Sequence, residues 1–187
     1  MPAFRFEGYV IVSADGMLAN ADNVMPDALK FEGDKKFFTA ALDRADLIVH
    51  GRHSGEGQPN SPNRRRIILT SRVAALARDP ANSNGTLWNP SSATFEQAAD
   101  FSGVYGGTVA IIGGPAVFDL FMDRYETFWL SQAPHVRIAS GKGCFPGVPA
   151  RTPQQILGSH GLEPGRSQTL DPAAEVTVTP WLRYTSP

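Results

Sequence analysis

The sequence predicts an α/β fold with a mostly parallel central sheet. Two observations support this class. Short runs rich in Val, Ile, Leu and aromatic residues, which are typical of buried strands, alternate along the chain with segments that carry apolar residues at helical spacing. Towards the C-terminus, two β-like runs follow each other with no helix between them. Parallel strands joined by helices, with an antiparallel end, are therefore expected.

Five segments match the pattern of buried strands. They are FRFEGYVIVS (4–13), ADLIVHG (45–51), RRIILTS (65–71), TVAIIGG (108–114) and ETFWLSQ (126–132). Apolar residues at helical spacing predict helices over 34–42, 116–122 and, from a weaker pattern, 94–101. The polar segment 82–92 contains Pro and Gly, so it is expected to be a loop around a short strand at 86–88.

The C-terminal part of the chain, 167–184, predicts an antiparallel hairpin. It holds the runs SQTL and EVTVTPWLRY on either side of Asp171–Pro172, a pair typical of turns. We expect this hairpin to close one edge of the sheet. Because no internal repeat, low-complexity tract or long linker divides the sequence, residues 1–187 are expected to form a single domain.

Composition excludes several classes of protein. The net charge of −1, from 17 basic and 18 acidic residues, provides no overall field that would attract nucleic acid or an anionic membrane. No apolar run approaches the ~20 residues of a membrane span, and Arg5 and Glu7 interrupt the apolar N-terminal segment where a secretory signal would be uniformly apolar. The four histidines and the single Cys144 show no metal-ligand spacing. A cytoplasmic protein without a metal, and with neither nucleic acid nor membrane as partner, is expected.

The stretch IIGGPAVFDLF (111–121) places two glycines and a proline between a predicted strand and a predicted helix. Without a Cβ in the way, the backbone N–H groups of Gly113 and Gly114 could approach a phosphate at the helix N-terminus. The other interpretation is a tight turn, with Pro115 in the first helical turn. The sequence has neither a G-x-G-x-x-G run nor the lysine of a P-loop, so this stretch alone favours the simple turn.

Several further motifs occur together. They are SADGMLA (13–19), MP (25–26), DKKFFTAAL beginning at Asp34, GRHS (51–54), RRIILTSR (65–72), IIGGPAVF (111–118) and GCFPG (143–147). In order and approximate spacing, over nearly the whole chain, they resemble the dihydrofolate reductase superfamily. The Ser-x-Asp-Gly and Gly-Gly-Pro patterns are most similar to the reductase domain of the riboflavin-biosynthesis deaminase-reductase, whereas MP, the acid at 34 and Gly-Arg-His-Ser are similar to the folate branch. The resemblance implies a three-layer fold with helices on both faces of the sheet, and an NADPH-dependent reductase.

The resemblance also implies which residues bind NADPH. Arg52 would reach the cofactor phosphates, since a guanidinium makes charge-assisted hydrogen bonds to phosphate oxygens. Thr70, Ser71 and Arg72 would hold the 2′-phosphate that distinguishes NADPH from NADH. The full set of implied cofactor-binding residues is Leu18, Gly51, Arg52, His53, Ser54, Thr70, Ser71, Arg72, Gly113, Gly114, Pro115, Ala116 and Val117. For either arginine taken alone, an ordinary solvated surface residue is the alternative.

Asp34 is the implied catalytic residue. Its neighbours on the predicted helix include Phe37 and Phe38, and an apolar pocket would raise the pKa of its carboxyl and suit it to proton transfer. The alternative is that Asp34 is a helix N-cap, in which case Glu56 is the next candidate acid. By similarity, Phe38 would stack on the substrate ring, and Ser131 would bond near the carboxylate through a water.

The expected substrate is a small pterin- or pyrimidine-like heterocycle, with dihydrofolate and 5-amino-6-(5-phosphoribosylamino)uracil as the two models. Gly57 and Gln58 stand where riboflavin-type enzymes have an aspartate, and Arg64 is the nearest basic candidate for a folate glutamyl carboxylate. Two other classes stay open: a non-catalytic NADP-binding regulatory module, and a purely structural α/β domain. By the same resemblance we expect a homodimer.

Overall fold

A computed structural model of the chain describes residues 3–184. Within these residues ten strands form one sheet, and its six central strands are parallel. In spatial order they are β8 (Tyr125–Ala133), β1 (Phe4–Ser13), β7 (Gly107–Ile111), β3 (Leu47–Gly51), β4 (Arg66–Leu69) and β6 (Gly85–Trp88). The predicted α/β class with a mostly parallel sheet is confirmed.

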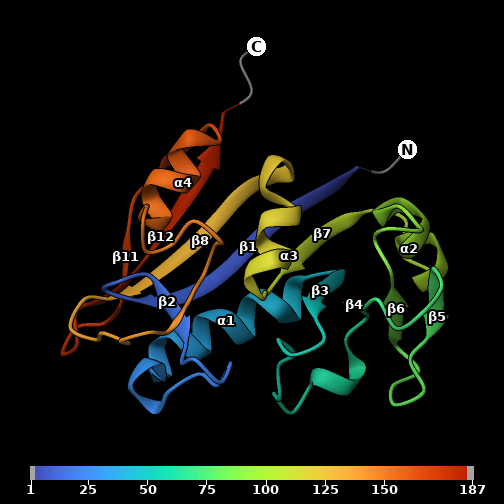
Figure 1. Cartoon of the computed structure of the whole chain (residues 1–187), viewed down its shortest axis with the longest axis horizontal. Coiled ribbons are helices and arrows are strands. Elements are labelled where there is room, and N and C mark those ends of the chain that lie inside the picture. The colour runs from blue at the N-terminus through green and yellow to red at the C-terminus, as the bar shows by residue number, and fades with distance from the viewer. Residues whose placement is uncertain (1–2, 185–187) are drawn as a thin grey trace.

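Antiparallel strands flank this central set on both sides. They are β5 (Leu76–Arg78) beside β6, β12 (Val176–Arg183) beside β8, and β10 (Leu162–Pro164) and β11 (Gln168–Asp171) beside β12. A separate small sheet pairs β2 (Met17–Ala19) with β9 (Lys142–Gly143). Figure 1 shows β11 and β12 at one end of the molecule and β5 and β6 at the other. The C-terminal hairpin predicted within 167–184 is therefore confirmed.

Helices cover both faces of the sheet. They are α1 (Glu32–Arg44), α2 (Phe95–Ser102), α3 (Pro115–Leu120) and α4 (Pro153–Ser159), with 3-10 turns at Asp27–Leu29, Ser61–Asn63 and Met122–Arg124. Successive strand residues point to opposite faces, so Ile48 and Ala110 pack with Leu42 of α1, whereas Val49 and Ile111 join the larger core that α2, α3 and α4 share. Full burial of a side chain such as Leu42 contributes about 1.5–3 kcal/mol. The three-layer arrangement is thus the one that the motifs implied.

Several element bounds differ from the predicted ones. The strand predicted over 108–114 ends at Ile111, because the Gly-Gly-Pro turn begins two residues later, at Gly113. The helix predicted from Asp34 begins two residues earlier, at Glu32. The helix predicted over 116–122 is Pro115–Leu120, and a separate 3-10 turn follows it.

Some short elements had no recognisable pattern in the sequence. These are β2, β5, β9, β10 and α4, none longer than seven residues. A run of two or three residues is too short to show a hydrophobic period. The helix α4 has a clear start, since Thr152 and Gln155 form a complete capping box, but its apolar positions are few.

Among residues 3–184, no helix has the length and apolar character needed to cross a membrane. The same part of the chain contains no group of three or more His, Cys, Asp or Glu side chains that could hold a metal ion. Cys144 is buried.

Candidate active site

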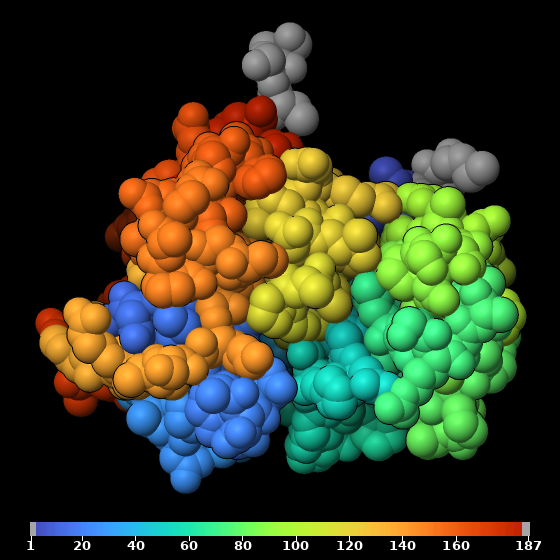
Figure 2. Space-filling view, in the orientation of Figure 1, coloured from blue at the N-terminus to red at the C-terminus, as the bar shows by residue number. Residues whose placement is uncertain are grey.

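One large cavity, of about 800 Å³, opens on the surface near the carboxyl ends of the parallel strands. Its walls come from α1 and the loop before it, from the loop after β3, and from the turn between β7 and α3. Figure 2 shows the surface hollowed between the blue N-terminal residues and the teal residues of the loop after β3, below the yellow α3. Ligands of open α/β sheets commonly bind at this edge.

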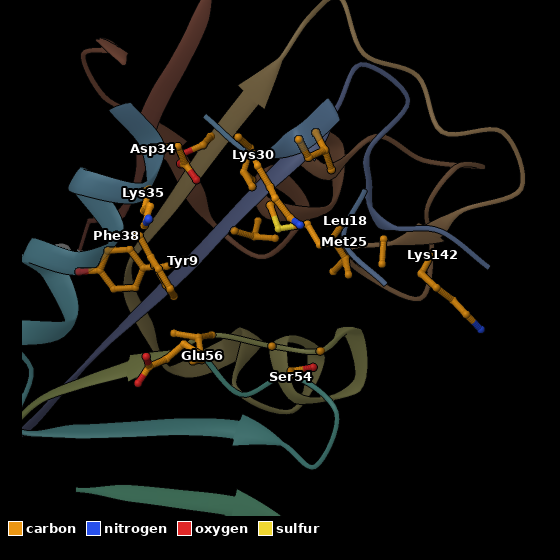
Figure 3. A pocket seen from close by; sticks show the side chains of 18 of the residues that line it. Tyr9, Leu18, Met25, Lys30, Asp34, Lys35, Phe38, Ser54, Glu56 and Lys142 are labelled. Atoms are coloured by element: carbon orange, nitrogen blue, oxygen red, sulfur yellow. The ribbon is translucent and has the colours of Figure 1, made fainter. Parts of the chain in front are cut away.

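Asp34 projects from the first turn of α1 toward this cavity (Figure 3). Burial raises the pKa of its carboxyl from 3.8 to about 6, and a hydrogen bond from the Ser131 hydroxyl partly opposes that rise. Ser131 lines the same cavity, and the water expected to bridge its hydroxyl and the carboxyl stays a prediction. The N-cap residue of α1 is Phe31, so the alternative interpretation of Asp34 as the N-cap is wrong.

Aromatic side chains form the wall next to Asp34. Phe37 and Phe38 of α1 line the cavity together with Tyr9 of β1 and Trp129 of β8. The rings of Tyr9 and Trp129 are stacked, with centroids 6.5 Å apart, and Phe38 meets Tyr9 edge to face. Burial, together with the hydrogen bond that its hydroxyl donates to Glu7, raises the pKa of Tyr9 well above its usual value. The aromatic rings thus give this part of the wall an apolar surface, with the carboxyl of Asp34 at its edge.

The Gly113–Gly114 turn forms the opposite wall. Its peptide bond is cis, and Gly51 N–H donates to Gly113 O over 2.7 Å. A Cβ built on Gly114 would lie 3.0 Å from Ser54 Oγ. The absence of that Cβ leaves the backbone open to the cavity between the turn and the loop after β3.

The cavity unites nine of the residues that the sequence predicted for the site. They are Leu18, Asp34, Phe38, His53, Ser54, Gly113, Gly114, Pro115 and Ser131. Seven others do not line it: Gly51, Arg52, Thr70, Ser71, Arg72, Ala116 and Val117. The side chain of Val117 belongs to the core, and its N–H donates to Gly114 O, so its backbone donor is already used.

The predicted phosphate-binding residues do not line the cavity. Arg52 follows β3 and Thr70–Arg72 follow β4, and because these two strands are adjacent and parallel, both groups lie at the same edge of the sheet. Arg52 is exposed and contacts His53, with Arg52 Nη2 and His53 Nε2 3.2 Å apart. Ser71 and Arg72 are exposed just beyond β4, and the N–H of Arg72 donates to Thr70 Oγ1. Within residues 3–184, neither Arg52 nor Arg72 forms an ion pair with an acid. Both guanidinium groups are available to an anion.

Arg64, the candidate for a folate carboxylate, is not available. Its side chain is 6% exposed and forms ion pairs with Asp43 at 2.5 Å and Glu56 at 3.1 Å. Arg66 binds the other Glu56 oxygen at 2.7 Å. Burial would raise the pKa of Glu56, but the hydrogen bonds from Arg66 and from the Gln58 N–H outweigh it and lower the pKa. Glu56 lines the cavity as a paired carboxylate and is a poor proton donor.

Sequence reasoning missed several cavity residues. Tyr9 and Trp129 could have been found, since each lies two residues from a cavity residue on the same strand, and such residues share a face: Ile11 on β1 and Ser131 on β8. Lys30 and Lys35 flank Asp34 in sequence (Figure 3). Lys142 comes to the cavity through the short β2–β9 pairing, for which the sequence had no signal.

The sequence matches no protein-family model, and no curated protein matches it. Solved structures do match. Dihydrofolate reductase from Enterococcus faecalis, solved in complex with NADP(H) and RAB-propyl, is 16% identical and superposes with a TM-score of 0.67 over 97% of each chain. A protein from Shewanella sp. PV-4, whose name assigns it provisionally to riboflavin biosynthesis, has the same identity and TM-score over 97% of this chain and 99% of its own. The chain therefore has the dihydrofolate reductase fold that the motifs predicted.

Proposed function

We propose that this chain, which has the dihydrofolate reductase fold, is an NADPH-dependent reductase of a pterin- or pyrimidine-like heterocycle. One observation carries the proposal. A carboxyl with a pKa raised to about 6 stands at the edge of an aromatic-walled cavity of about 800 Å³. Such a cavity suits a planar ring, and the carboxyl suits proton transfer to a ring nitrogen.

The residues present fit a dinucleotide cofactor. Gly114 leaves a backbone cradle that a Cβ would narrow, since that atom would lie 3.0 Å from Ser54 Oγ. Arg52 and Arg72 are exposed and do not line the cavity. By the resemblance of the motifs, their guanidinium groups would bind the phosphates of a bound cofactor. The chemistry that NADPH supplies when bound is hydride donation.

The protein's own residues would orient the substrate and hold a proton. The rings of Phe38 and Trp129 would exclude water from one face of a bound heterocycle. With a pKa of about 6, Asp34 is protonated in roughly a tenth of the molecules at pH 7. The Ser131 hydroxyl would orient the carboxyl, since it lines the same cavity and lowers the pKa of Asp34. Asp34 therefore both anchors an N–H donor of the ring when ionised and supplies a proton when protonated.

The ion pairs of Arg64 limit the kinds of substrate that the cavity can bind. A folate carries an acidic tail, but the guanidinium groups of Arg64 and Arg66 are already bound to Glu56 and Asp43. Breaking a buried ion pair to bind a tail would cost several kcal/mol. We therefore favour a heterocycle that does not depend on a guanidinium contact from Arg64.

The test has two stages. NADPH and NADH are titrated by fluorescence, and NADPH is expected to bind more tightly. Oxidation of NADPH is then followed at the nicotinamide absorbance band with dihydrofolate and with the pyrimidine intermediate of riboflavin synthesis. Turnover with either compound supports the proposal. The absence of NADPH binding would contradict it.

A non-catalytic NADP-binding module is the competing function. It would be favoured by a solvent-exposed Asp34, because such a carboxyl would have an ordinary pKa. Asp34 is partly buried and its pKa is raised, which argues against this function. NADPH binding with no turnover of any heterocycle would nevertheless select this function in the same experiment.

A further inference from the structure

The first turn of α1, which carries Asp34, is not fixed by a capping side chain. Its N-cap residue, Phe31, makes no side-chain capping hydrogen bond. By contrast, α2 and α4 each begin with a complete capping box. The first backbone N–H groups of a helix have no partner inside the helix, so an uncapped end is held only by its surroundings. The position of Asp34 must depend on what α1 packs against.

Gly33, the residue before Asp34, packs directly on the C-terminal hairpin. A Cβ built on Gly33 would lie 1.9 Å from the carbonyl oxygen of Leu170 and 2.7 Å from its carbonyl carbon. These atoms belong to the backbone of β11 and cannot rotate away as a side chain could. The contact therefore exists only because residue 33 is glycine.

Leu170 is the extra residue of a β-bulge. In the hairpin of β11 and β12, Thr169 pairs with Thr177 and Asp171 pairs with Val176, which leaves Leu170 without a partner in the ladder. A bulge bends its strand and turns backbone groups away from the partner strand. At this bulge the carbonyl of Leu170 faces Gly33.

The same hairpin also reaches the partner of Asp34. On one side β12 pairs with β8, where Val178 lies opposite Ser131. On its other side, Val178 lies opposite Gln168 of β11. The hairpin thus connects the strand that carries Ser131 to the helix that carries Asp34, although within residues 3–184 none of its own residues lines the cavity.

We propose that Gly33 and the bulge at Leu170 are positioning elements for Asp34. By seating the first turn of α1 on β11, they hold the carboxyl in the cavity wall against Ser131. This inference rests on the proposed function, because Asp34 is the group that is positioned. It gives the C-terminal hairpin a role in the site that it does not line.

The variant Gly33→Ala separates the two backbones. Alanine has the higher helix propensity, so the helix itself is not weakened, but its methyl group pushes the first turn of α1 away from β11. Asp34 then moves into more solvent, and its pKa falls from about 6 toward the ordinary 3.8, by about one unit, because the gain in solvation outweighs the loss of the Ser131 hydrogen bond, which by itself would raise the pKa. The charged groups of the cavity wall nearest Asp34 in sequence, Lys30, Glu32 and Lys35, are unchanged.

The control variant is Gly158→Ala in α4, where an added Cβ would meet nothing within 4 Å. The pKa of Asp34 is measured in the full chain by carboxyl ¹³C NMR, without cofactor or substrate. We expect a lowered pKa in Gly33→Ala and an unchanged pKa in Gly158→Ala. A folded Gly33→Ala protein in which Asp34 titrates as in the parent would overturn the proposal. A failure of the proposed function is distinguishable from a failure of this proposal. In that case the parent protein would not bind NADPH, but Gly33→Ala would still lower the pKa of Asp34.

If Gly33→Ala does not fold, a second pair of variants tests whether the bulge at Leu170 positions Asp34. Leu170 and Val136 both pack against the core cluster around Leu29 and Val176, but only Leu170 belongs to the bulge. Leu170→Ala removes the side chain that packs the bulge onto this cluster, so the bulge and its carbonyl are expected to shift from Gly33 and the pKa of Asp34 is expected to fall. Val136→Ala is expected to leave the pKa of Asp34 unchanged at a similar loss of stability. Equal pKa values in these two proteins would also overturn the proposal. Where turnover is found, kcat should fall in Leu170→Ala, with the midpoint of its pH profile displaced in the same direction and NADPH affinity unchanged.

Discussion

At the scale of single residues, Asp34 reduces stability at neutral pH. Its folded-state pKa of about 6 exceeds the value of 3.8 expected in the unfolded chain. Between those two values the folded protein binds more protons than the unfolded chain, so stability falls as the pH rises through this window and stays lower above it. Asp34→Asn should therefore raise the free energy of unfolding at pH 7 by up to about 2–3 kcal/mol. Urea denaturation at pH 7 and pH 4 checks this, since most of the gain should disappear at pH 4.

The same substitution should impair the reaction. Asparagine keeps the shape of the side chain but holds no transferable proton, so Asp34→Asn should lower the rate of hydride transfer by roughly a hundredfold or more. The deficit should shrink at low pH, where solvent supplies the proton, and NADPH affinity should stay nearly unchanged. Stopped-flow measurement of NADPH oxidation on a verified substrate is the appropriate assay. A parent-like rate would mean that the proton comes from another group.

Arg72 tests the choice of cofactor. If its exposed guanidinium, beside Thr70 and Ser71, binds the 2′-phosphate, Arg72→Ala should weaken NADPH binding by about 1.5–3 kcal/mol and NADH binding much less. Arg166→Ala is a suitable control, because Arg166 is also exposed and does not line the cavity. Fluorescence titration of both cofactors gives the comparison. Equal losses for NADPH and NADH would refute the role of Arg72.

At the scale of elements, the turn between β7 and α3 makes a sharp prediction. Gly114 has a φ of −79°, which other residues adopt, so Gly114→Val should leave a folded protein. Its branched side chain would fill the space beside Ser54, and NADPH binding should be lost. The matched control is Gly57→Val, where a Cβ would meet nothing within 4 Å. Unchanged NADPH affinity in Gly114→Val, with a parent-like near-UV CD spectrum, would show that the glycines form a simple turn.

His50, near the end of β3, predicts that the protein loses stability when the pH is lowered. Arg66 donates to His50 Nε2, so His50 Nδ1 carries the proton that bonds Gly51 O and the ring is neutral. Burial lowers the pKa of His50, and the charge of Arg66 lowers it further. The hydrogen bond to Gly51 O and the charges of Glu56 and Asp79 oppose this without cancelling it. The unfolded chain takes up a proton near pH 6.5 while the folded protein does not, so stability is full above pH 6.5 and is lost as the pH falls below it.

The measurement is urea unfolding at pH 7 and pH 5.5. Asp34 also titrates in this pH range, and its effect on stability has the opposite sign. The two proteins compared therefore both carry Asp34→Asn, and one of them also carries His50→Gln. Glutamine can accept the hydrogen bond from Arg66 but does not titrate. The loss of stability on acidification should therefore be smaller in the glutamine variant. An equal loss in both proteins would assign the acid response to other groups.

Whether the sequence predicted the bounds of an element correctly depended on the length of that element and on how far apart in the sequence its contacting residues lie. The bounds of β1 were predicted correctly, because ten residues of strand pattern are unambiguous. The start of α1 was misplaced, because its N-cap is Phe31 and the helix is fixed by a contact with Leu170, far away in the chain. The ion pair of Arg64 could not be predicted from the sequence for the same reason, since its partner Asp43 lies far from it in the chain, on α1.

At the scale of the whole molecule, the larger core is continuous from one end of the sheet to the other. Trp88 and Phe95 belong to it beside α2, and Leu162 and Trp181 belong to it beside the C-terminal hairpin. The strands between them are adjacent in the sheet although they are distant in sequence. A boundary between two independently folding parts would have to cut through this core.

The chain should therefore unfold as one cooperative unit. Its three tryptophans report on separate regions, with Trp88 on β6, Trp129 on β8 and Trp181 on β12. In variants that keep a single tryptophan, the others being Phe, urea unfolding followed by fluorescence should give the same midpoint as far-UV CD of the same protein. Each Trp→Phe change can lower the overall stability, so the comparison is made within each variant. A fluorescence midpoint that differs from the CD midpoint in the variant that keeps Trp88 or in the one that keeps Trp181 would divide the chain into two units and contradict the single-domain prediction, because a continuous core cannot lose one end while the other keeps its full burial.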